Sequence, residues 1–161
     1  MRKFILSTKR YLVYLFLLFP FIAEGEPGDL IGYNYQESID LTAIEIGFAI
    51  VGGLGFATPE YTISCYDVKY ESENSEGNLD TLSGLVVIPN AATQAFPMLS
   101  YQRGTGILDA EAPSNSGLSL SNLEVFLVGY LATTSGFITL IPDYVGLGNP
   151  NLYHPYHIKD S

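Results

Sequence analysis

The sequence predicts an α/β fold in which an antiparallel hairpin leads into a β–α–β unit of parallel strands. Residues 61–70 and 83–89 are rich in β-branched and aromatic side chains, which favours a pair of strands. Residues 96–102 and 137–142 are short, nearly continuous apolar runs, as is typical of buried parallel strands. The stretch between these two runs repeats apolar residues at helical spacing, which predicts a helix. Two parallel strands need a connection of this kind, and such a crossover is right-handed as a rule.

The first 25 residues have the pattern of a secretory signal. Four basic residues stand within the first ten positions, an apolar run follows over residues 11–23, and Ala23 and Gly25 supply the small residues of a cleavage site. A membrane span needs about 20 apolar residues, so this run is too short for a stable one, although an uncleaved anchor is the alternative. We expect residues 1–25 to be removed and the remainder to be secreted or periplasmic.

Charge and composition exclude several classes of partner. The chain has 7 basic and 17 acidic residues, a formal net charge of −10, and four of the basic residues belong to the signal. Such a field repels phosphate backbones, so we expect no nucleic-acid partner. Cys65 is the single cysteine, and His154 and His157 form no cluster with metal-ligand spacing. The sequence therefore predicts no disulfide within the chain, no metal and no cofactor.

Residues 26–60 are expected to form a loop followed by a helix. The polar stretch 26–40 contains Pro27 and glycines, which favours a loop. The apolar segment that follows, 41–57, is rich in small residues, and Asp40 is placed to cap a helix that ends near Gly52.

Residues 61–161 hold the sheet elements. The polar stretch 71–80 predicts a hairpin with a long tip. The helix after the loop at 103–118 is expected to begin at Ser119 or Ser121 and to stop at Gly136. Ligands of parallel sheets bind beyond the carboxyl ends of the strands. The loops that start at Arg103 and Asp143 lie at that end, which predicts the site there.

Five motifs in order resemble those of the secretory lipases of the α/β-hydrolase fold. They are SGLVVIP, FPMLSYQRGT, APSN, GFITLIPDYVGLG and HPY, and the match in order and spacing runs from about residue 61 to residue 161. In that family the third strand ends in His-Gly-Thr, the fourth ends in Pro-Asp-Tyr-x-Gly-x-Gly, and His-Pro-Tyr follows. The resemblance implies that residues 61–161 are the N-terminal half of an α/β-hydrolase domain, with an incomplete sheet.

The resemblance also implies roles for the two loops. Gly104 and Thr105 would belong to the oxyanion loop, with the Thr105 N–H as the donor to a developing oxyanion; the alternative is a plain glycine turn. Arg103 stands where the family has His, and it could pair with Asp109 or Glu111. Site-shaping positions in the second loop are Asp143, Tyr144, Gly146 and His154. Asp143 is expected to be a turn residue rather than a nucleophile.

The chain contains no Gly-x-Ser-x-Gly nucleophile elbow, and the nearest string, Ser114 to Gly117, lies in a predicted loop. The resemblance implies that nucleophile, acid and base all come after Ser161, so no catalytic residue is expected in this chain. We expect the N-terminal part of a secreted hydrolase of ester or lipid substrates, inactive by itself. The alternatives are a non-catalytic secreted binding module and one chain of a split hydrolase.

The last predicted strand, 137–142, bears on these alternatives. It has no following helix to cover it, which predicts an exposed apolar strand edge. A C-terminal half or a docking chain would cover that edge.

The signal pattern is directly testable. Export of the chain is expected to remove residues 1–25, within a few positions, and N-terminal sequencing of the exported product measures this. An exported product that still begins at Met1 would contradict cleavage.

Overall fold

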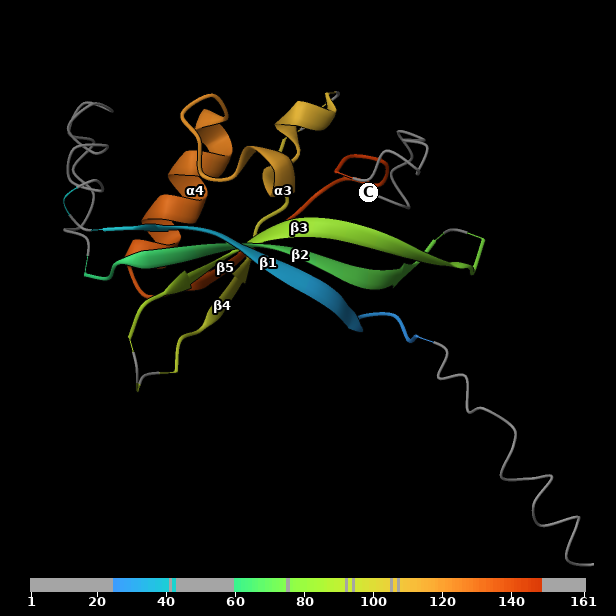
Figure 1. Cartoon of the computed structure of the whole chain (residues 1–161), viewed down its shortest axis with the longest axis horizontal. Coiled ribbons are helices and arrows are strands. Elements are labelled where there is room, and N and C mark those ends of the chain that lie inside the picture. The colour runs from blue at the N-terminus through green and yellow to red at the C-terminus, as the bar shows by residue number, and fades with distance from the viewer. Residues whose placement is uncertain are drawn as a thin grey trace, which may run out of the picture.

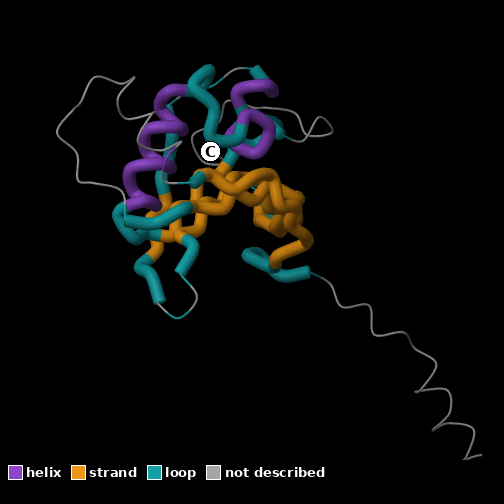
Figure 2. Tube along the Cα trace, turned by 60° about the vertical axis from the view of Figure 1, so that its left-hand side comes forward, coloured by secondary structure: helices purple, strands orange, loops and turns teal. Residues whose placement is uncertain are grey.

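The computed structural model describes residues 25–148, apart from 41, 43–59, 75, 92, 94, 105 and 107. Residues 1–24 of the predicted signal, the predicted helix at 41–52 except for Thr42, and His154 lie outside these residues. The described part forms a five-stranded sheet with helices over one face (Figures 1 and 2). None of the described helices has the length and apolar character needed to cross a membrane.

The strands occur in the spatial order β1-β2-β3-β5-β4. Neighbouring strands are antiparallel from β1 to β5, and β4 and β5 are parallel. This confirms the predicted α/β fold with a hairpin followed by a parallel pair. The elements are β1 (Leu30–Ile39), β2 (Ile63–Glu73), β3 (Leu79–Pro89), β4 (Met98–Ser100), the 3-10 turn η1 (Asp109–Glu111), α3 (Pro113–Ser116), α4 (Leu123–Thr134) and β5 (Ile138–Pro142).

Strand β1 corrects the prediction of a loop at 26–40. It pairs with β2 along its length, with irregularities near Gly32 and Gln36. The alternation of Tyr33 and Tyr35 with polar residues is a strand pattern that the overall polarity of the segment obscures. Both tyrosine rings lie edge-on against Tyr66 of β2, so cross-strand aromatic contacts stabilise this edge strand.

The β2–β3 hairpin is longer, and its tip shorter, than the sequence predicted. Pairing continues to Glu73 and Leu79, so the tip is 74–78 rather than 71–80. The Asn74 side-chain oxygen accepts hydrogen bonds from the main-chain N–H groups of Glu76 and Asn78, each at 3.0 Å. Gly77 supplies the positive φ of 83° that the tight turn requires.

Helix α4 begins later than predicted, because Asn122 caps it in place of Ser119 or Ser121. The Asn122 side chain accepts from the Val125 N–H, whereas the hydroxyl of Ser119 accepts from the Ser121 N–H in the preceding turn. Ser119 and Ser121 thus complete each other's hydrogen bonds before the helix starts. The predicted stop is confirmed, with Gly136 at φ 92° directly after the last turn.

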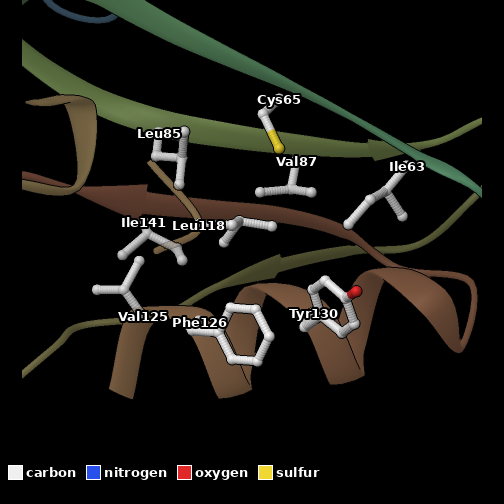
Figure 3. Close-up of a cluster of buried hydrophobic side chains, with 9 residues drawn as sticks. All are labelled: Ile63, Cys65, Leu85, Val87, Leu118, Val125, Phe126, Tyr130 and Ile141. Atoms are coloured by element: carbon white, nitrogen blue, oxygen red, sulfur yellow. The ribbon is translucent and has the colours of Figure 1, made fainter. Parts of the chain in front are cut away.

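The hydrophobic core lies between α4 and one face of the sheet (Figure 3). It is formed by Ile63, Cys65, Leu85, Val87, Leu118, Val125, Phe126, Tyr130 and Ile141. Burial raises the pKa of the Cys65 thiol to about 12, so this cysteine is a core side chain rather than a nucleophile. Gly129 of α4 lets Leu118 approach, because a Cβ there would lie 2.6 Å from the Leu118 side chain.

The opposite face of the sheet, which we call the open face, is covered by none of the described helices (Figures 1 and 2). Tyr35, Tyr66, Val86 and Leu140 are cross-strand partners on this face. The expectation of an exposed edge at 137–142 is wrong, because β5 lies between β3 and β4. The sheet edges are β1 and β4.

One-sided packing predicts unequal effects for two neighbouring residues of β5. Ile141→Ala empties a fully buried position and is expected to lower the free energy of unfolding by about 2–5 kcal/mol. Leu140→Ala, on the open face, is expected to cost about 1 kcal/mol, because Leu140 is only half-buried. Urea unfolding measures both. Equal losses would mean that the open face is covered in solution.

Candidate functional site

The loops that follow β4 and β5 meet at the carboxyl ends of these parallel strands. The Tyr144 hydroxyl donates a hydrogen bond to the carbonyl oxygen of Arg103. The guanidinium carbon of Arg103 lies 5.7 Å from the centroid of the Tyr144 ring, a cation–π distance. The structure therefore brings together two of the residues that the sequence placed in the site.

Arg103 is buried, with 5% of its surface exposed. Its Nη1 donates to the carbonyl oxygen of Glu111 at 2.6 Å, so the bond formed with η1 uses the main chain rather than the expected carboxylate. Gly106 leaves room for this side chain, because a Cβ at that position would overlap Nη2. Arg103 thus ties the loop after β4 to η1.

Gly104 is held by α4. Its N–H donates to the Glu124 carboxylate at 2.7 Å, and the Tyr101 hydroxyl donates to the same oxygen at 2.6 Å. These two bonds lower the pKa of Glu124. The Gly104 N–H is therefore engaged within the chain. Thr105 lies outside the described residues, and its role as an oxyanion donor stays a prediction.

Asp143 is buried at the centre of a hydrogen-bond cluster that the sequence did not reveal. Its carboxylate accepts from the hydroxyls of Ser83 and Ser114 and from the Ser114 N–H at 3.1 Å. Burial raises the pKa of Asp143, against the opposing effect of these hydrogen bonds and of the Arg103 charge. The cluster links β3, α3 and the loop after β5. No sequence motif identifies Ser83, because its contact to Asp143 depends on the β3–β5 register.

The turn after Asp143 folds back on η1. The Leu147 N–H donates to the Tyr144 carbonyl at 2.9 Å, and Gly146 adopts a φ of 83°. The Gly148 N–H then donates to the Asp109 carboxylate at 2.7 Å. Gly146 is thus a conformational requirement of this turn, while His154 lies outside the described residues.

The described residues hold neither a nucleophile with its base nor a metal centre. Ser114 is buried and donates its hydroxyl to Asp143, and no histidine occurs between residues 25 and 148 to serve as a base. No group of three or more His, Cys, Asp or Glu side chains in the described part is arranged to hold a metal ion. Ser114 positions Asp143 instead.

Comparison with solved structures identifies the kind of fold. The chain is similar to a candidate hydrolase from Legionella pneumophila, with 27% identity, a TM-score of 0.65, and coverage of 79% of this chain and 33% of that one. It is also similar to a ligand-bound form of the rice cell wall degrading esterase LipA from Xanthomonas oryzae, with 23% identity, a TM-score of 0.65, and coverage of 82% and 32%. No protein-family model and no curated protein matches the chain.

These likenesses define the class of fold. The chain has a hydrolase-like α/β fold, and it spans about a third of the length of the solved structures it matches.

Asp143→Asn tests the electrostatics of the cluster. Because the pKa of Asp143 is raised above 3.8 in the folded chain, the folded state holds this proton more tightly than the unfolded state does. The resulting stabilisation is complete below the unfolded-state pKa and is lost as pH rises through the raised pKa. The free energy of unfolding of Asp143→Asn relative to wild type should therefore increase from about pH 4 to about pH 7. Urea unfolding at both pH values measures it.

Asp143→Ala is the control for the hydrogen bonds. It leaves the buried Ser114 N–H and two hydroxyls without their acceptor, so it is expected to cost about 2 kcal/mol or more at both pH values. A relative stability of Asp143→Asn that falls with rising pH would contradict the raised pKa.

Proposed function

We propose that this chain provides the N-terminal part of a secreted serine ester hydrolase. The observation that carries the proposal is the likeness of about four-fifths of the chain to a candidate hydrolase and to an esterase. The junction of the loops after β4 and β5 supports it, because ligands of parallel sheets bind at this end. Residues 1–25 serve as the signal, 26–60 lead in, and 61–161 form the first half of the domain.

The reaction is acyl transfer from a small-molecule ester or lipid. A serine attacks the ester carbonyl, the oxyanion is stabilised by main-chain N–H groups, and water then releases the acid. Within this chain Thr105 would supply one oxyanion donor. Glu124 and Tyr144 bind the N–H and the carbonyl oxygen of the Arg103–Gly104 peptide, which directly precedes the residue that would carry this donor. A preorganised donor is worth roughly 3–4 kcal/mol of barrier.

The serine, the acid and the base come from polypeptide beyond these 161 residues. The sequence has no Gly-x-Ser-x-Gly elbow. The proposal also gives the open face a cover at β4 and β5, the one parallel pair among the described strands, since purely parallel sheets are covered on both faces. A C-terminal half, continuous or docked as a separate chain, would cover this face and pair with β4.

The purified 161-residue chain is expected to show no turnover of a short-chain p-nitrophenyl ester, because no described serine has a base. Residues 26–161 joined to the C-terminal part of the Legionella candidate hydrolase are expected to hydrolyse the same ester. Spectrophotometric assay of both proteins measures this. Turnover by the chain alone that survives Ser114→Ala and Ser161→Ala would contradict the proposal.

In the joined protein, Thr105→Pro removes the main-chain donor, and the expected loss of turnover is about a hundredfold or more. Thr105→Ala keeps the N–H and is the matched control, with a far smaller loss expected. Thermal unfolding of both variants separates loss of the donor from loss of the fold. A folded but inactive joined protein would favour a non-catalytic binding module.

A further inference from the structure

Glu124 is an exposed residue whose carboxylate is nevertheless bound by the segment that follows β4. Its Oε1 accepts from the Tyr101 hydroxyl at 2.6 Å and from the Gly104 N–H at 2.7 Å. Glycine at position 104 gives the carboxylate room, because a Cβ there would lie 3.0 Å from Oε2. The carboxylate therefore lies directly against the main chain of this loop.

The peptide unit between Arg103 and Gly104 is bound on both sides. Its N–H donates to Glu124, and its carbonyl oxygen accepts from the Tyr144 hydroxyl. The two side chains come from separate elements, α4 and the loop after β5. A peptide whose donor and acceptor are both bound cannot rotate without breaking a hydrogen bond. These contacts therefore fix the orientation of this peptide at the carboxyl end of β4.

The main chain of Glu124 is anchored by the core. Glu124 lies in the first turn of α4, directly before Val125 and Phe126, which are buried against the sheet. The hydrogen bonds from Tyr101 and Gly104 lower the pKa of Glu124, with the Tyr101 bond having the larger effect, and the Arg103 charge adds to them against partial desolvation. Glu124 is therefore ionised at neutral pH, and both of its hydrogen bonds are charge-assisted.

We propose that Glu124 is a positioning residue of the hydrolase, which holds the Arg103–Gly104 peptide in the orientation that the reaction needs. This inference rests on the proposed function, because the loop after β4 matters for catalysis only if the site lies at this edge of the sheet. Glu124 acts through the main chain of the loop and touches no reacting atom.

A purely structural role for Glu124 is the alternative that the test has to separate. An acidic residue in the first turn stabilises a helix through its negative charge, whatever else it contacts. Glutamine distinguishes the two roles, since it lacks the charge but keeps an oxygen that can accept from Tyr101 and Gly104. Alanine removes both the charge and the acceptor.

Amide NMR of the 161-residue chain tests the contact without any need for activity. The Gly104 N–H resonance of the wild type is expected to move as pH falls through the lowered pKa of Glu124, below 4.5, because protonation weakens the acceptor. In Glu124→Gln this resonance should stay in place over the same pH range. In Glu124→Ala the Gly104 N–H is expected to exchange with heavy water about tenfold faster or more. A wild-type resonance that does not respond to pH, or an unchanged exchange rate in Glu124→Ala, would overturn the proposal.

Kinetics of the joined protein test the role. Glu124→Ala is expected to lower kcat about tenfold or more with little change in KM or melting temperature, because a misplaced main-chain group affects the transition state more than substrate binding. Glu124→Gln should retain most of kcat. Glu76→Ala, at an exposed position of the β2–β3 hairpin tip, removes the same charge and should leave kcat unchanged. Equal losses in the glutamine and alanine variants, or a loss that follows the melting temperature, would show a structural role instead.

The two experiments keep this inference apart from the proposed function. A folded joined protein without turnover, in which NMR still shows the Glu124 contact, would contradict the hydrolase proposal rather than the contact. Turnover that is insensitive to Glu124→Ala would contradict the positioning role and leave the hydrolase proposal standing.

Discussion

The packing of α4 against one face of the sheet is the contact on which the rest of the structure depends. Val125 and Phe126 of the helix belong to the same buried cluster as Leu85 and Ile141 of the sheet. No residue of this cluster is charged. Because α4 connects β4 to β5, this contact makes the two strands parallel neighbours and brings their carboxyl ends to the same edge. The packing of α4 on the sheet is therefore enough to place the candidate site at this edge, and the polar contacts are not needed for that.

Hydrogen bonds then hold together the loops that the packing of α4 brings to this edge of the sheet. Tyr144 joins the loop after β5 to the loop after β4, and Asp143 joins the same loop to β3 and α3. The Asp143 cluster is possible because β3 and β5 are antiparallel neighbours, which places Ser83 beside the end of β5. A serine on the hairpin therefore contributes to a site whose other parts come from the β–α–β unit.

The sequence predicted the elements that have a strong periodic or motif signal. The hairpin, the helix ending at Gly136 and the last strand were predicted from their apolar and β-branched residues, although the buried face of α4 includes Thr133 and Thr134 and leaves Leu123 exposed. Strand β1 was missed because Tyr33 and Tyr35 gain their contacts only after β2 is in place. The Asn122 cap was missed because Ser119 and Ser121 are also good capping residues. Only the structure shows that these two serines bond to each other in the turn before the helix. The tyrosine contacts join strands that are distant in sequence, and the cap is one of several local hydrogen bonds that compete with one another. Neither kind of contact has a sequence pattern of its own.

The same reasoning explains why the two buried charges of the site differ. Asp143 lies where three donors converge, so its charge is solvated by the chain, although burial still raises its pKa. Arg103 has one donor bound to a carbonyl oxygen and a ring near its plane, which leaves the Nε–Nη2 edge unsatisfied. The Asp143 carboxylate takes its hydrogen bonds from Ser83 and Ser114, and Arg103 is bound through the Glu111 carbonyl oxygen. The two buried charged groups therefore fasten the loops after β4 and β5 through separate hydrogen bonds, one to η1 and the other to β3 and α3.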